Sequence, residues 1–173
     1  MDSVNDPAMT ARAFEAACTV AAEHGLASTA AVVIADANNV LVHLRPAPVV
    51  ARVATTAATF SDPSERLARE LAVAGFLAER GAAVVAPSGE LPAGPHHSGG
   101  LWMSFWRHVE CAEPASAEPE EAARALAPLH ALLAESPLEL PVLEPVLGEL
   151  PRVIEALAVT RIDAVDLDLL QAA

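Results

Sequence analysis

Lysine and tyrosine are absent from this sequence, and aromatic residues make up only 3% of it. The ten cationic side chains are all arginine, against 23 acidic ones, and the formal net charge is −13. Nucleic acids and anionic membranes are bound through clustered cations, so neither is an expected partner. The same acidity suits a protein that attracts cationic small molecules.

Cysteines and long apolar runs are also scarce. Cys18 and Cys111 lie far apart, and two thiols predict neither a disulfide framework nor a metal site. No apolar run approaches the roughly 18 residues of a membrane span. Met1 is followed by acidic and polar residues rather than by the basic and apolar start of a secretory signal. The cytoplasm is therefore the expected location.

Hydrophobic residues, many of them alanine, make up 53% of the 173 residues, which is enough for a core of small aliphatic contacts. Apolar residues recur with helical spacing over 8–24 and again over 63–80. The second helix opens with Asp-Pro-Ser-Glu and closes at Gly81, which are strong start and stop signals. Between the helices, apolar runs at 29–36, 39–44 and 49–54 predict three strands, the last two joined by a tight turn at 45–48.

Two further strands are predicted at 82–86 and 101–109, with a flexible loop rich in Pro, Gly and Ser between them. Helices are predicted beyond an acidic connector, at 119–135 and 143–158, where Pro128 and Pro151 are expected to kink or shorten them. Hairpin strands with one intervening helix favour an antiparallel sheet, so the expected fold class is α+β. The expected domains are an N-terminal helix (1–28), a sheet domain (29–109), and a linker with further helices (110–173).

The most informative residue is Arg52, a lone cation within the apolar run 49–54. A buried charge without a partner is very costly, so Arg52 is expected to have one, and Glu70 on the following helix is the candidate. In kinase folds a basic residue of the third strand contacts the nucleotide phosphates, and a Glu of the next helix orients it. The alternative is that Arg52 and Glu70 both face solvent, and the spacing alone slightly favours that alternative.

The sequence resembles the aminoglycoside phosphotransferase family, kinase-like enzymes that phosphorylate small-molecule hydroxyls. The matching segments, in order, are 39–44 (NVLVHL), 48–54 (PVVARVA), 65–70 (ERLARE) running into 76–81 (FLAERG), 101–110 (LWMSFWRHVE) and 123–130 (ARALAPLH). The resemblance implies a kinase-like N-terminal lobe with an antiparallel sheet and one packed helix. It also implies that residues 110–173 begin a C-terminal lobe.

The resemblance gives Arg52 the role of anchoring phosphates, with Glu70 as its orienting partner. The family usually has Lys here, whereas the planar fork of Arg can hold two phosphate oxygens or a carboxylate. The turn 36–39 takes the place of the nucleotide-covering loop, so Asn39 is a candidate nucleotide contact. That turn lacks the family's Gly-rich pattern.

The strand 101–109 would lead into the hinge between the lobes. By the resemblance, backbone groups near Ser104 to Trp106 meet adenine and Met103 lies behind it. Ordinary core packing is an equal alternative for Met103 and Trp106. The implied cofactors are ATP and Mg²⁺. The implied partners are a nucleotide and a small hydroxylated substrate, and a cationic substrate is one option.

The family's catalytic loop, His-Gly-Asp with a downstream Asn, is missing, because none of the six histidines is followed by that pattern. The expectation is therefore a fragment that lacks the catalytic base and the Mg²⁺ ligands and is inactive alone. The expected chemistry of the whole enzyme is transfer of the γ-phosphoryl group of ATP to a small-molecule hydroxyl. The alternatives are a non-catalytic kinase-like binding module and an unrelated α+β domain in which Arg52 and Glu70 never meet.

Two other sets of residues are weaker candidates for a metal site. The three aspartates within 163–168 imitate a carboxylate cluster, although such helical edges are usually solvated. His96 and His97 lie in the Gly/Pro loop, where no Cys or carboxylate stands at ligand spacing. Neither set is expected to bind a metal.

Overall fold

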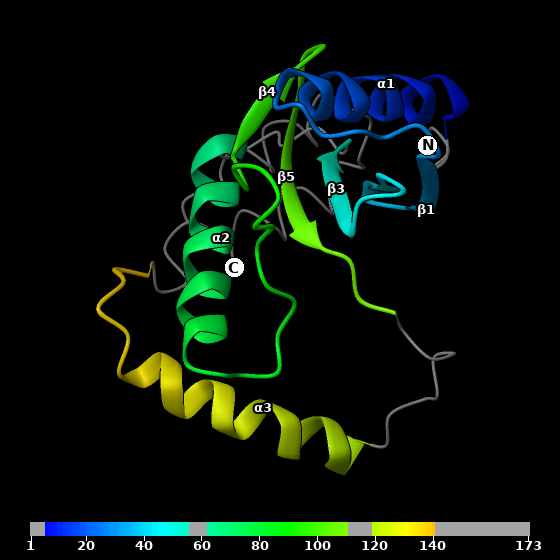
Figure 1. Cartoon of the computed structure of the whole chain (residues 1–173). Helices are drawn as coiled ribbons and strands as arrows, with labels where there is room; N and C mark the ends of the chain where they lie inside the picture. Colours follow the sequence, from blue (N-terminus) through cyan, green and yellow to red (C-terminus); the bar gives the residue numbers. More distant parts are fainter. Residues whose placement is uncertain (1–5, 56–61, 111–118, 141–173) are drawn as a thin grey trace, which may run out of the picture. The chain divides into compact units, whose positions relative to one another are not determined.

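The computed structural model describes residues 6–55, 62–110 and 119–140. Residues 6–55, 63–110 and 119–138 belong to one compact unit, which contains every residue discussed below. The helices predicted at 143–158 and beyond 162, and the aspartates within 163–168, lie outside the described residues. The elements follow in the order α1 (Pro7–Glu23), β1 (Val32–Asp36), β2 (Asn39–His43), β3 (Val49–Ala54), α2 (Pro63–Glu79), β4 (His96–Ser98), β5 (Leu101–Arg107) and α3 (Pro119–Ala134) (Figure 1).

The strands form one antiparallel sheet in the order β1-β2-β3-β5-β4, which confirms the predicted α+β class. The backbone N–H of Leu44 donates to the carbonyl of Val49 at 2.9 Å and closes the β2–β3 hairpin. This hairpin sets Leu41 opposite Arg52. After β3 the chain passes through α2 and β4 and then returns, and β5 pairs directly with β3. Arg52 therefore also lies opposite Ser104.

The two faces of this sheet differ in burial. In β3, Val49, Ala51 and Val53 are fully buried, whereas Val50, Arg52 and Ala54 are partly exposed. This alternation follows from the two-residue period of side chains along a strand. We call the first side the core face and the second side the Arg52 face.

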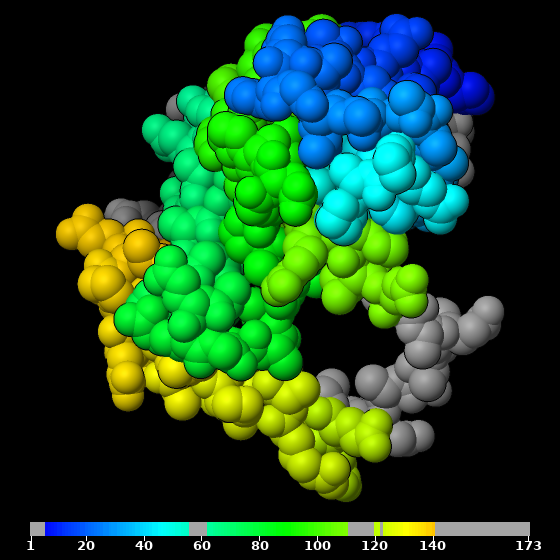
Figure 2. Space-filling view, viewed as in Figure 1, coloured from blue at the N-terminus to red at the C-terminus, as the bar shows by residue number. Residues whose placement is uncertain are grey.

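Helix α1 covers the core face. Its N-terminal residue Asp6 accepts a hydrogen bond from the N–H of Ala8 at 2.9 Å, and Pro7 occupies the first turn, so the helix begins one residue before the predicted position. Small side chains let the helix approach the strands closely, and in the space-filling view its blue surface is continuous with that of the strands (Figure 2). The packed side chains are Ala13, Ala16, Ala17, Val20 and Ala21 of α1 with Val40, Val42, Val49, Ala51, Val53, Met103 and Phe105 of the strands.

Helix α2 runs beside β5 and matches its sequence signals (Figure 1). It begins at Pro63, the expected first helical position, and the chain turns at Gly81 with a φ of 73°, a conformation that suits glycine. Its buried residues are Leu67, Leu71, Phe76 and Leu77. Helix α3 continues through Pro128 to Ala134, close to the predicted range 119–135, so Pro128 does not shorten it.

The prediction of a strand at 82–86 was wrong, because the structure has no strand there. The backbone N–H of Arg107 donates to the carbonyl of Ala86 at 3.0 Å, and an isolated bridge joins Pro87 to Trp106. The second outer partner of β5 is instead β4, which lies within the stretch predicted to be loop and includes His96 and His97. No helix among the described residues is long and apolar enough to cross a membrane.

Candidate functional site

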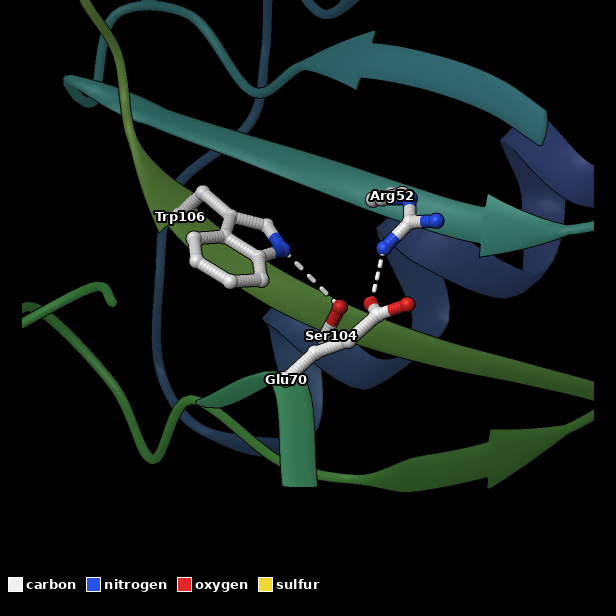
Figure 3. A network of polar contacts seen from close by, with 4 residues as sticks. All are labelled: Arg52, Glu70, Ser104 and Trp106. Atoms are coloured by element: carbon white, nitrogen blue, oxygen red, sulfur yellow. Dashed lines mark hydrogen bonds and ion pairs between the residues drawn. The ribbon is translucent and has the colours of Figure 1, made fainter. Parts of the chain in front are cut away.

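Arg52 and Glu70 meet on the Arg52 face of the sheet, where Nη1 of Arg52 contacts Oε2 of Glu70 (Figure 3). The structure thus brings together the cation of β3 and the carboxylate of the helix that follows it. The sequence suggested a deeply buried cation, but the two side chains are 29% and 34% exposed. An ion pair this exposed contributes about 0–1 kcal/mol to folding, so stability alone gives little reason for it.

An aromatic side chain stands beside this pair. Trp106 is on the same strand and the same face as Ser104, and its indole Nε1–H donates to the Ser104 hydroxyl at 2.9 Å. Figure 3 shows the two contacts next to each other, the indole and hydroxyl from β5 and the ion pair between β3 and α2. A planar ring and a guanidinium therefore face the same space.

That space is a pocket of about 240 Å³. It is lined by Ile34, Leu41, Val50, Arg52, Val85, Trp106, Arg107, His108 and Val109. Ile34, Val85 and Val109 are large apolar side chains that are each close to half exposed, and all three line this one pocket. Apolar side chains gathered around a partly open hollow are typical of a ligand site rather than of an ordinary surface.

The polar side chains that line the pocket all carry nitrogen. Arg52 and Arg107 are permanent cations with donor groups only, and the Trp106 indole can only donate. No carboxylate or hydroxyl is among the lining residues. A planar apolar ligand that presents acceptor atoms or negative charge is the best chemical match to this lining.

A pair of stacked histidines lies at one end of the pocket. The ring of His43, at the end of β2, stacks on His108 with centroids 3.7 Å apart and planes 12° apart. Nε–H of Arg45 donates to Nδ1 of His43 at 3.3 Å, so that nitrogen acts as an acceptor. Burial of His43 lowers its pKa, and the neighbouring His108 and Arg45 lower it further. His43 is therefore held as a neutral ring that supports His108 against the pocket.

Backbone groups of β5 do not line the pocket in the predicted way. The N–H of His108 donates to the carbonyl of Pro48 at 2.8 Å. Hydrogen-bonded pairs alternate along an antiparallel ladder, so the backbone groups of Trp106 and Ser104 are also bonded to β3. Phe105 donates to Ala93 at 2.8 Å on the other side. Because the sheet already uses these groups, the contribution of this stretch to the pocket comes from side chains.

Met103 lies on the opposite side of the sheet. It is fully buried among the residues that pack under α1, which matches the core-packing alternative. It is not among the residues that line the pocket. The structure therefore separates Met103 from Arg52, Glu70 and Trp106.

Asn39 opens β2 and pairs with Ala54, which places it on the Arg52 face but beyond the pocket lining. The turn before it consists only of Ala37 and Asn38 between the two strands. The residue before the turn, Asp36, is held in place because its carboxylate accepts a hydrogen bond from the Thr10 hydroxyl of α1. A two-residue turn tied down in this way is too short to wrap around a triphosphate.

Several pocket residues were missed by sequence reasoning. Leu41 and Val50 follow from the β2–β3 hairpin, because closing it around 45–48 places them next to Arg52. Ile34 could not be found this way, because it depends on how β1 pairs with β2, and that pairing shifts register between Val33 and Ala35. Val85 and Val109 come from irregular segments whose positions depend on tertiary packing.

No protein-family model, curated protein sequence or solved structure matches this chain. Among the described residues, no three His, Cys, Asp or Glu side chains gather in a way that could hold a metal ion. The case for function therefore depends on the pocket and on the Arg52–Glu70 pair.

Proposed function

We propose that the sheet and α2 form the nucleotide-binding N-terminal lobe of an ATP-dependent phosphotransferase of the aminoglycoside phosphotransferase type. The observation that carries this proposal is the contact between Arg52 and Glu70 at the edge of an apolar, aromatic-walled pocket. In protein kinases the same two roles fall to a cation on the third strand and a glutamate on the following helix. Here the cation is on the third strand of the chain, the glutamate is on the helix that follows it, and the two side chains are in contact.

The pocket suits a nucleotide, because it offers an apolar surface for the base and a cation for the phosphates. Leu41, Val50 and Trp106 lie on one face of the sheet and give a planar ring an apolar surface to pack on. Arg52 then supplies charge and hydrogen bonds to phosphate oxygens, while Glu70 limits the orientations that its guanidinium can take. The ring would lie toward His108, and the phosphates would extend toward Arg52.

The lobe alone would bind but not transfer the phosphoryl group. Transfer also needs a base or water-positioning residue and Mg²⁺ ligands. We assign neither to the described residues. The complete reaction would move the γ-phosphoryl group of ATP to the hydroxyl of a small molecule, and the acidic balance of the chain favours a cationic one.

A second candidate is a non-catalytic nucleotide-binding module. The short, tied turn before Asn39 favours this option, because an active kinase-like lobe normally covers the phosphates with a longer Gly-rich loop. Both candidates predict nucleotide binding at the same pocket. They differ in whether a hydroxylated substrate is phosphorylated when nucleotide and Mg²⁺ are supplied.

Binding is tested by isothermal calorimetry with a non-hydrolysable ATP analogue. Arg52→Ala is expected to weaken binding by about tenfold or more, since it removes a charge-assisted contact worth roughly 1.5–3 kcal/mol. Its unfolding midpoint should change little, because the side chains of the Arg52–Glu70 pair are about one-third exposed. Unchanged affinity in a folded Arg52→Ala protein would refute the phosphate role.

Arg124→Ala is the matched control. Arg124 is 72% exposed and also pairs with a glutamate, Glu120, at 3.1 Å, but it lies on α3 away from the pocket lining. This variant loses the same charge and the same kind of ion pair. It should bind the analogue as the wild type does, so a comparable loss would point to net charge rather than to a site.

A further inference from the structure

Ser104 is a polar residue at the centre of the sheet that the nucleotide proposal leaves without a side-chain role. It is fully buried, and its hydroxyl accepts the indole N–H of Trp106 at 2.9 Å. It is not among the residues that line the pocket, so it cannot touch a ligand there. Any effect of the Ser104 hydroxyl on binding must therefore pass through a neighbour.

Ser104 lies next to both Arg52 and Trp106, the two residues to which the proposal gives the phosphates and the ring. It pairs with Arg52 across β3 and β5, and it lies two residues before Trp106 on the same face of β5. Figure 3 shows its hydroxyl between the indole nitrogen and the Glu70 carboxylate. The bond from Trp106 limits rotation of the indole, because turning the ring away from Ser104 would break it.

We propose that Ser104 is a positioning residue that sets the orientation of the Trp106 ring and thereby the affinity of the pocket for planar rings. The site then has two independent supports, Ser104 for the aromatic wall and Glu70 for the guanidinium of Arg52. This inference rests on the proposed nucleotide site. It adds that ring binding and phosphate binding are controlled by different side-chain contacts.

The two supports can be separated with two partial ligands, adenosine for the ring and inorganic tripolyphosphate for the phosphates. Ser104→Ala is expected to weaken adenosine about fivefold, the equivalent of one lost net hydrogen bond, and to leave tripolyphosphate within twofold of wild type. Glu70→Gln should weaken tripolyphosphate and leave adenosine within twofold of wild type. Equal losses of both ligands in Ser104→Ala would overturn the positioning role, because general loosening of the sheet affects both ends.

A Trp106→Phe background gives the decisive control. This change keeps a planar ring but removes the N–H, so Ser104→Ala should have no further effect on adenosine in that background. If Ser104→Ala still weakens adenosine there, the hydroxyl does not act through the indole and the proposal fails.

A ligand-free readout separates this inference from the nucleotide proposal. In a Trp102→Phe background, Trp106 is the single tryptophan, and its emission and near-ultraviolet dichroism report its orientation and hydrogen bonding. Ser104→Ala should change both signals while far-ultraviolet dichroism stays constant, and unchanged signals would overturn the positioning role. If wild type binds neither adenosine nor tripolyphosphate, the nucleotide proposal fails whatever these spectra show.

Discussion

The two faces of the sheet are built from the same strands but have different compositions. On the core face, valine, alanine, methionine and phenylalanine pack under α1 with almost no exposed surface. On the Arg52 face, the same strands present a cation, a buried serine, a tryptophan and stacked histidines around a partly open pocket. Adjacent residues such as Phe105 and Trp106 thus belong to different environments. The first face forms the core, and the second carries the residues on which the proposed function depends.

The largest expected effect separates these two faces directly. Phe105→Ala removes a fully buried side chain from the core face and should lower the free energy of unfolding by about 3–5 kcal/mol. Trp106→Ala, one residue further along, removes a larger but only partly buried side chain, and it should lower the free energy of unfolding clearly less. Urea denaturation of both variants, followed by far-ultraviolet dichroism, measures the difference.

Ligand affinity should rank these two variants in the opposite order. Trp106→Ala should weaken adenosine strongly, whereas the folded fraction of Phe105→Ala should bind it nearly as the wild type does. If Trp106→Ala costs as much stability as Phe105→Ala, the Arg52 face is a second core and the division into two faces is wrong.

A smaller effect concerns His43, which is 7% exposed although it lies on the Arg52 face. Its pKa is lowered in the folded protein, so below its ordinary value of about 6.5 the unfolded chain binds the proton more readily than the folded one. The contribution of His43 is therefore complete above pH 6.5. Stability should fall as the pH drops from about 6.5 toward the lowered pKa.

Thermal unfolding between pH 7.5 and 5 checks this dependence. His43→Phe keeps a flat ring against His108 but cannot bind a proton, so its stability should lose the part of the pH dependence that belongs to His43. A His24→Phe variant is the control, since that histidine caps α1 and is well exposed. The same slope in wild type and His43→Phe would show that His43 is not held neutral by folding.

The sequence predicted the framework of both faces but only part of the site. The β2–β3 hairpin and α2 followed from turn and capping signals, and the Arg52 position with Glu70 followed from a cation within an apolar strand. The burial of Met103 and the exposure of Trp106 could not be assigned, because both depend on which face α1 covers. Helix α1 is a long-range partner of the sheet, and local pattern gives no information on where it docks.

The irregular segments account for most of the remaining errors. The stretch 82–86 has the composition of a strand, but it meets β5 only at its end, through Ala86 and the bridge at Pro87, while β4 pairs with the other end of β5. The register shift in β1 beside Ile34 has no sequence signal, because it depends on the pairing of β1 with β2. Pocket walls that come from such segments emerge only from the three-dimensional structure.

The smallest expected effect tests whether the Arg52–Glu70 pair belongs to function rather than to folding. A double-mutant cycle with Arg52→Gln, Glu70→Gln and the double variant should give a coupling free energy below about 1 kcal/mol in urea denaturation, since both side chains are about one-third exposed and screened by water. The same cycle measured by tripolyphosphate affinity should give a larger coupling, because Glu70 acts only through the orientation of Arg52. A coupling free energy that is large in urea denaturation and absent in tripolyphosphate binding would make the pair a structural contact. The Arg52 face would then differ from the core face only in its exposure.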